Sequence, residues 1–232
     1  MGDYHFLVAC RRRLLLAVAK DGQDRCGFCG KGMDRNMEHA ITCQSRGRAE
    51  IHQKVKLATI KALKAIGSKT GHKVYNEPSL AKFVKENAAN TKANQELKLR
   101  RADIKVQNPV LHEVYLFDVR TCSPKIPSQE SDVGSTVQKG EDEKVQFYGN
   151  NFVFPESTVL IPFAIDSYGK WGNRFKHFLK HFCKLAAGED EKMYNQLIKN
   201  ARETIQVAHA NAIGKRIFTN MAASRGEAYD EA

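Results

Sequence analysis

Long hydrophobic runs are missing from this chain of 232 residues, and the apolar run that begins at Leu14 is far too short to cross a bilayer. Blocks of like charge and internal repeats are missing as well, so we expect most of the chain to fold. A hydrophobic content of 42% is sufficient for a packed core, and the length suits one ordinary α/β domain with a small appendage.

Acidic residues are in deficit. Lysine and arginine number 37 against 26 aspartates and glutamates, which gives a net charge of +11. Such an excess favours an anionic partner, and nucleic acid is the most common one. The charge by itself leaves a second interpretation open, a basic surface that is only solvated.

The pattern of a disulfide-rich secreted domain is also absent. Three of the six cysteines crowd into residues 26–43, and the other three stand alone. Isolated cysteines are typical of a reducing compartment, where thiols bind metals more often than they form disulfides. The basic cluster at residues 11–13 precedes too few apolar residues for a secretory leader. We therefore expect a soluble, intracellular protein without a membrane contact.

Hydrophobic periodicity and turn residues predict four segments. These are an N-terminal helix in 1–24, a Cys/His segment in 25–44, a core in 45–218 and a disordered tail in 219–232. Within the core we predict helices at 45–66, 137–149 and from 170 to 218, and strands at 74–75, 100–107, 113–120 and 158–166. Pro162 predicts that the last strand lies at an edge or contains a bulge. The order indicates an α/β or α+β fold with one mixed central sheet flanked by helices.

Four metal-binding side chains follow one another in the Cys/His segment with two, nine and three residues between them: Cys26, Cys29, His39 and Cys43. A Cys-x2-Cys pair turns two thiolates toward one ion, and a downstream histidine and cysteine complete a tetrahedron. Four protein ligands leave no open position, so we predict a structural zinc site that folds a segment with little core of its own. Glu38 is a weaker candidate ligand than Cys43.

Two aspartates lie within predicted neighbouring strands, Asp103 in the first and Asp118 near the end of the second. A carboxylate among apolar strand residues is costly unless something compensates its charge. A shared Mg²⁺ ion would do so, and it would also activate water and neutralise a phosphate. Pairing with nearby arginines, or exposure at the strand ends, explains the two aspartates equally well.

A metal-assisted hydrolase also profits from a cation near the attacking water. Arg120 follows Asp118 closely, but a guanidinium is a poor base. Lys144 lies four residues before Tyr148 and hence on the same face of a helix, an arrangement that ordinary helix surfaces also show. Glu77, before Pro78, is either a further acid of this site or a turn residue.

Taken together, these motifs resemble the restriction-like endonuclease domain of non-LTR retrotransposons, a branch of the PD-(D/E)XK nuclease superfamily. The likeness covers about residues 3–170 and rests on the Cys-Cys-His-Cys pattern, a basic helix, Arg101-Ala102-Asp103-Ile104, Phe117-Asp118-Val119 and Lys144-x3-Tyr148. It implies a restriction-endonuclease-like sheet, Mg²⁺ or Mn²⁺ held by Asp103 and Asp118, and catalytic roles for Lys144 and Tyr148. It also implies that the Cys/His segment is a zinc knuckle that assists DNA binding.

The resemblance further implies DNA contacts at Arg48 and His52, and the basic pair Arg100 and Arg101 would join them on phosphates. Two family positions differ here, because Ala102 stands in place of a proline and Ile51 in place of an arginine.

The implied activity is nicking of target DNA to leave a 3′-hydroxyl that primes reverse transcription. We therefore expect an endonuclease with access to the nucleus and with a reverse-transcriptase partner. The alternative is a zinc-knuckle protein with an inactive nuclease core that only binds DNA or RNA. A cysteine or histidine hydrolase is less consistent with the sequence, because zinc binding better explains the Cys/His cluster.

Overall fold

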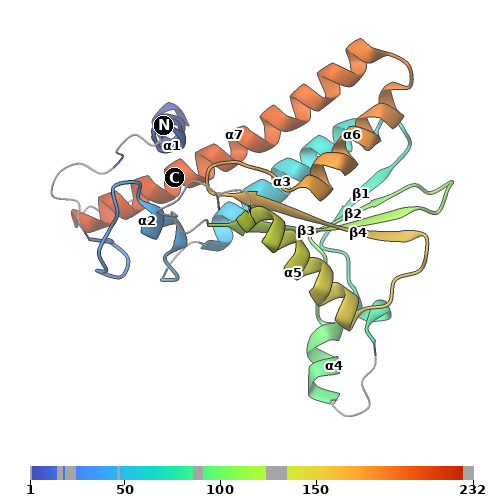
Figure 1. Cartoon of the computed structure of the whole chain (residues 1–232), viewed down its shortest axis with the longest axis horizontal. Helices are drawn as coiled ribbons and strands as arrows, with labels where there is room; N and C mark the ends of the chain where they lie inside the picture. The colour runs from blue at the N-terminus through green and yellow to red at the C-terminus, as the bar shows by residue number, and fades with distance from the viewer. Residues whose placement is uncertain are drawn as a thin grey trace.

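The computed structural model describes residues 2–14, 18, 25–45, 48–85, 91–123 and 135–226. In this part of the chain the protein is a mixed α/β structure, with helices on both faces of one open four-stranded sheet (Figure 1). The predicted mixed sheet flanked by helices is confirmed at this level. The Cys/His segment lies beside the core, near the C-terminal end of the longest helix.

The sheet contains β1 (Lys73–Asn76), β2 (Ile104–Gln107), β3 (Val114–Cys122) and β4 (Thr158–Asp166) in that spatial order. The first two pairings are antiparallel and the third is parallel. Pro162 lies in β4, which has a paired neighbour on one side only, so the predicted edge position is correct. An edge strand tolerates proline because the missing N–H removes no ladder hydrogen bond on the open side.

One face of the sheet forms the main core together with α3 (Arg48–Gly67), α6 (Asn173–Ala187) and α7 (Glu191–Ser224). Apolar and polar side chains alternate along β2, and the apolar ones, Ile104 and Val106, are fully buried on this face. Phe117 of β3 is also fully buried and meets Phe178 of α6 edge to face at 4.8 Å. Burying one such side chain contributes about 2–3 kcal/mol.

The opposite face is covered by α5 (Ser135–Asn151), which packs mainly on β3 and β4. Between this helix and the sheet lies a smaller apolar cluster formed by Leu80, Ala102, Leu116, Tyr148 and Phe152. Two short elements follow β1, the 3-10 helix η1 (Ala81–Phe83) and α4 (Thr91–Lys98). Residues 86–90, between these two elements, lie outside the described residues.

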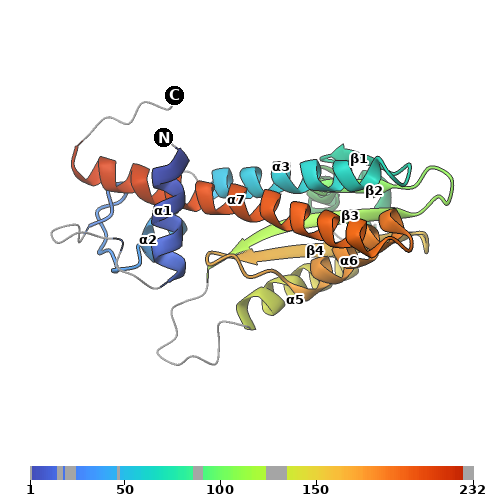
Figure 2. The same cartoon turned by 90° about the horizontal axis from the view of Figure 1, so that it is seen from above.

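The N-terminal helix α1 (Gly2–Arg13) and the short α2 (Glu38–Thr42) both pack on α7 (Figure 2). We expected disorder from residue 219 onward, but α7 continues to Ser224 and buries Asn220, Met221 and Ala222. The small and polar composition of this stretch suits a frayed end, whereas in the fold it contacts the Cys/His segment. The rest of the expected tail, 227–232, lies outside the described residues.

Strand boundaries also differ from the predictions in places. The strand expected at 100–107 begins only at Ile104, because residues 100–103 follow an irregular path that pairs with residues 77–80. β3 runs on to Cys122, two residues beyond the expected end. Residues 124–134, between β3 and α5, lie outside the described residues.

Candidate functional site

Four side chains of the Cys/His segment converge, as their spacing predicts. One ligand atom from each of Cys26, Cys29, His39 and Cys43 lies within 4.8 Å of the others. In the described part of the chain this is the one group of three or more such residues close enough to hold a metal ion. Three thiols and an imidazole are the donors that zinc prefers, and tetrahedral ligands of zinc lie about 3–4 Å apart. The arrangement therefore suits a closed four-ligand site.

Local backbone geometry brings the four donors together. The N–H of Gly30 donates to the carbonyl of Cys26 at 2.8 Å, and Gly30 has a positive φ of 71°, which allows the tight turn between the first two cysteines. The carboxylate of Asp34 accepts from three backbone N–H groups, those of Asn36, Glu38 and His39. This cap starts α2 and places His39 on its first turn.

The end of α7 contacts the donor set directly. The amide Nδ2 of Asn220 donates to the Sγ of Cys26 at 3.0 Å, and its Oδ1 accepts from the N–H of Gly27 at 3.2 Å. Burial opposes ionisation of the Cys26 thiol. The hydrogen bonds from Asn220 and from the backbone of Phe28 and Cys29 outweigh burial and lower the pKa of this thiol. Asn220 therefore favours the thiolate form that binds metal.

Two buried arginines attach the Cys/His segment to the core. Arg216 of α7 donates to the carbonyls of Ala40 at 3.0 Å and Cys43 at 2.9 Å. Arg12 of α1, fully buried, pairs with Glu38 and donates to the carbonyl of Ser167 at 2.5 Å. Glu38 is thus bound to arginine and is not one of the four clustered donors. Burial raises the pKa of Glu38 even though Arg12 opposes this effect.

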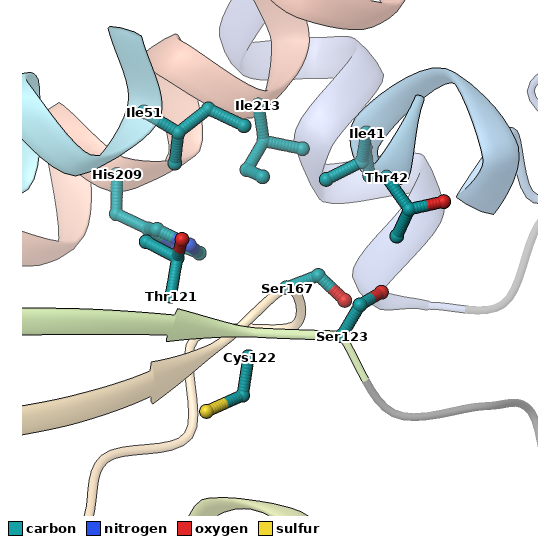
Figure 3. A pocket seen from close by; sticks show the side chains of 9 residues that line it. All are labelled: Ile41, Thr42, Ile51, Thr121, Cys122, Ser123, Ser167, His209 and Ile213. Atoms are coloured by element: carbon teal, nitrogen blue, oxygen red, sulfur yellow. The ribbon is translucent and has the colours of Figure 1, made fainter. Parts of the chain in front are cut away.

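A small cavity lies where α2, α3, α7 and the end of β3 meet (Figure 3). Its volume of about 20 Å³ is sufficient for a single water molecule. His209 of α7 lines this cavity, and neither of its ring nitrogens has a hydrogen-bond partner within the described residues. Burial, followed by repulsion from Arg13 and Arg12, lowers the pKa of His209 to about 3. The imidazole is therefore neutral at physiological pH.

The two predicted aspartates lie next to each other on neighbouring strands. Ile104 of β2 faces Phe117 of β3, so Asp103, one residue earlier, lies opposite Asp118. The N–H of Asp103 donates to the carbonyl of Phe117 at 2.9 Å, which continues the pairing by one residue. The Oδ2 of Asp103 accepts from the N–H of Val119 at 2.7 Å. The register therefore places the two aspartates opposite each other on neighbouring segments.

Each aspartate has a separate set of side-chain donors. The Nε2 of His52, from α3, lies 3.1 Å from the Oδ2 of Asp103. Lys144 and Tyr148, both from α5, donate to the Oδ2 of Asp118 at 2.9 Å and 2.5 Å. We call these five residues the carboxylate site. The five residues come from α3 on one face of the sheet, from α5 on the other face, and from the β2–β3 pair between the two helices.

Electrostatics in the carboxylate site follow from these contacts. The hydrogen bond to Asp103 outweighs burial and raises the pKa of His52 above its usual value. Burial, reinforced by the neighbouring Asp118, raises the pKa of Tyr148 strongly, so its hydroxyl stays protonated and donates. Asp118 itself is buried, with 8% of its surface exposed. A buried carboxylate of this kind requires a partner, and Lys144 supplies the compensating charge.

A second ion pair borders the carboxylate site and was not predicted. Lys56 of α3, whose side chain is 3% exposed, donates to the Oε1 of Glu77 at 2.5 Å. The hydrogen bond and charge of Lys56 lower the pKa of Glu77. Glu77 has a positive φ of 49°, and its N–H donates to the carbonyl of Asp103 at 2.9 Å. In the sequence Lys56 looks like one more lysine on a basic helix, and no local signal shows that it is buried.

The remaining predicted contact residues are spread around this region. Arg101 is exposed and donates to the carbonyl of Glu77, while Arg100 lies over the ring of Phe147. Arg48 begins α3, but its side chain lies outside the described part of the structure. Arg120, rejected as a base from the sequence, forms an ion pair with Glu143. Of the predicted DNA-contact residues whose side chains the structure describes, only His52 contacts one of the two aspartates, Asp103.

The chemistry of the carboxylate site fits a hard divalent cation. Mg²⁺ prefers carboxylate oxygens, usually one or two from the protein, and completes its shell with water and substrate phosphate. Asp103 and Asp118 are such a pair. Within the described residues, His52 and the N–H of Val119 both contact the Oδ2 of Asp103, so Oδ1 is the atom best placed to bind an ion without breaking these contacts.

Within the described residues, no helix is both long and apolar enough to cross a membrane.

Comparisons with known proteins found no match: no model of a known protein family matches the chain, and neither does any protein in a search of curated proteins.

Proposed function

We propose that this protein is a metal-dependent DNA endonuclease of the restriction-like type found in non-LTR retrotransposons, with a structural zinc ion in its Cys/His segment. The observation that supports the proposal most strongly is the pairing of Asp103 with Asp118 across β2 and β3, with Lys144 bound to Asp118. Two acids on neighbouring strands and a lysine from an adjacent helix are the parts that metal-assisted phosphodiester hydrolysis needs.

In the proposed reaction Asp103 and Asp118 would hold a Mg²⁺ or Mn²⁺ ion, and such an ion would lower the pKa of water and neutralise charge on the phosphate. Lys144 orients the attacking water and stabilises the negative charge that develops on the phosphate oxygens. Tyr148 keeps the Asp118 carboxylate in one orientation through its protonated hydroxyl. The expected products are a 3′-hydroxyl and a 5′-phosphate.

DNA would approach from the side on which the basic residues lie. Arg101 is exposed beside Glu77, and His52 lies next to Asp103. These groups, with Arg100 and Arg48, would bind backbone phosphates and set the position of the duplex without reading its sequence. In this proposal the zinc-bound segment supplies a further DNA contact, and the protein acts in the nucleus beside a reverse transcriptase.

Nicking of supercoiled plasmid tests the proposal. Zinc-loaded wild-type protein is incubated with Mg²⁺ or Mn²⁺, or without a divalent ion, and compared with Asp118→Asn and Lys144→Ala. Matched controls on the same helix are Asp142→Asn and Lys139→Ala, both at exposed positions. We expect metal-dependent relaxation that the first two substitutions abolish and the controls preserve. Relaxation that survives Asp118→Asn would refute the assignment.

A second candidate function rests on one specific observation. Every carboxylate of the region already has a cationic or donor partner in the fold: Asp103 with His52, Asp118 with Lys144, and Glu77 with Lys56. A site neutralised in this way also suits a protein that binds nucleic acid without cutting it. Stable DNA binding by wild-type protein, with no metal-dependent nicking of the same DNA, would favour this function.

A further inference from the structure

A groove of about 530 Å³ lies beside α5 on the same face of the sheet, along β1, β2 and the start of β3, the part of this face that α5 does not cover. Its floor is apolar and contains Val114 and Leu116. The segment around η1 forms one wall and the turn before β4 forms another. The volume falls in the range of about 300–1,000 Å³ that is usual for sites that bind small ligands or single chemical groups of larger ones.

Two lysines line the groove without an acidic partner. Lys105 of β2 lies with its Nζ 4.1 Å from the ring centre of Tyr75, and Lys82 lies 4.8 Å from that of Phe83. Within the described residues neither lysine forms an ion pair with a carboxylate, and no aspartate or glutamate lines the groove. Burial and then the neighbouring Lys82 lower the pKa of Lys105. An anion between the two ammonium groups would relieve their repulsion.

The rest of the lining suits a flat heterocycle. The Tyr75 side chain is 41% exposed, and Phe83 supplies a second ring. Asn76 and Gln107 also line the groove, and side-chain amides of this type match the donor and acceptor pattern of base edges. Rings for stacking, amides for base edges and ammonium groups for phosphates are the parts with which proteins bind unpaired nucleotides.

The groove is separate from the carboxylate site. Leu116 forms part of the groove floor and also packs in the cluster that contains Tyr148, whose hydroxyl binds Asp118. The two sites therefore share a wall but no lining residue. A ligand in the groove would leave the metal-binding carboxylates free.

We propose that this groove binds single-stranded nucleic acid, with bases stacked on Tyr75 and Phe83 and phosphates held by Lys82 and Lys105. Duplex DNA does not fit, because its bases are stacked on each other and out of reach of the two rings. An acidic peptide would satisfy the lysines but leave the rings and amides unused. The inference goes beyond the proposed nuclease and stands whether or not the protein cuts DNA.

Photocrosslinking and binding together test the groove. The probe is an oligothymidylate that carries 5-iodouracil, incubated with the zinc-loaded full chain in the absence of Mg²⁺ and chelators, so that no cleavage occurs and zinc stays bound. After irradiation, mass spectrometry locates the crosslinked residue. Affinity is measured separately by fluorescence anisotropy for single-stranded and duplex oligonucleotides.

We expect crosslinks at Tyr75 or Phe83 and preferential binding of the single strand. Tyr75→Ala and the double variant Lys82→Gln with Lys105→Gln should weaken single-strand binding about tenfold or more while duplex affinity stays unchanged. Phe6→Ala is the matched aromatic control, because Phe6 is also 41% exposed, and Lys180→Gln is the control for lost charge.

Three outcomes would overturn the proposal: no single-strand binding by wild-type protein, crosslinks only outside the groove, or equal losses in the groove and control variants. Competition by polyglutamate with no loss in Tyr75→Ala would identify the groove as a site for acidic peptides instead. Zinc content and circular dichroism establish that each variant is folded. Plasmid nicking by the same variants reports on the nuclease independently, because the groove residues do not contact Asp103 or Asp118.

Discussion

The side-chain amide of Asn220 binds the sulfur of Cys26, although the two residues lie 194 positions apart in the chain. This contact links the last turns of α7 to the metal-binding cysteines. It also satisfies the N–H of Gly27 next to Cys26. Substitution of a residue that orients a metal ligand from outside the coordination shell typically lowers metal affinity by about 10–100-fold.

Asn220→Ala should therefore weaken zinc binding by about 10–100-fold, because the thiolate of Cys26 loses its side-chain donor. Competition with a chromophoric zinc chelator measures the change. Asn200→Ala is the matched control, since Asn200 is exposed on the same helix and its side chain accepts a hydrogen bond from Gln196, far from the Cys/His segment. Equal zinc affinities for both variants and the wild type would contradict this role for Asn220.

Arg12→Met should destabilise the protein by about 3–5 kcal/mol, because it leaves the largely buried Glu38 carboxylate without its partner. The double variant Arg12→Met with Glu38→Met should recover part of this loss. Urea unfolding provides the measurement. Lys199→Met, which removes an exposed pair with Glu203, should cost less than about 1 kcal/mol. A similarly small effect for Arg12→Met would show that its ion pair is dispensable.

His209 should make the protein less stable in mild acid. Its folded pKa of about 3 lies below the ordinary value of 6.5, so the unfolded chain takes up a proton that the folded protein excludes. The stability present above pH 6.5 is therefore lost as the pH falls toward 3, by at most about 1.4 kcal/mol per pH unit.

Between pH 7 and pH 5 wild-type protein should lose about 2 kcal/mol more than His209→Leu, because the variant has no proton to gain at this position. Urea unfolding at both pH values measures the difference. His181→Leu, at an exposed position on α6, should behave like the wild type. Parallel losses in wild type and His209→Leu would mean that other groups control the acid sensitivity.

Tyr148→Phe should reduce nicking about tenfold without a change in DNA affinity, because Asp118 loses a hydrogen bond but keeps Lys144. Single-turnover rates at saturating protein measure the effect. The matched control is Val145→Ala, an exposed apolar position on the same helix. If Tyr148→Phe cuts at the wild-type rate, the hydroxyl is not needed to position Asp118.

Local patterns predicted much of this fold. The bounds of β4 match the prediction because a strand rich in branched side chains ends at a turn that contains Gly169. The four clustered donors were predicted because their spacing is short enough to determine their geometry. Asp103 and Asp118 were placed on neighbouring strands for a similar reason, since few residues separate β2 from β3.

These local patterns could not predict contacts between segments that are distant in the sequence. Arg12, Arg216 and Asn220 look like ordinary polar residues, and only the packing of α1 and α7 shows that they are buried. Lys56 looks in the sequence like one more lysine of a basic helix, although it is buried against Glu77. A helical pattern shows which residues share a face, but it does not show which other segment covers that face.

The length of α7 has a mechanical consequence. Its 34 residues form one uninterrupted rod of about 51 Å that contacts α6 and α3 in the core as well as α1 and α2 beside the Cys/His segment. The helix therefore fixes the distance and the relative rotation between the Cys/His segment at one end and the core helices at the other. One residue inserted into the middle of this rod would turn its two ends by about 100° relative to each other. The relative orientation of the two ends of α7 therefore depends on its length to within a single residue.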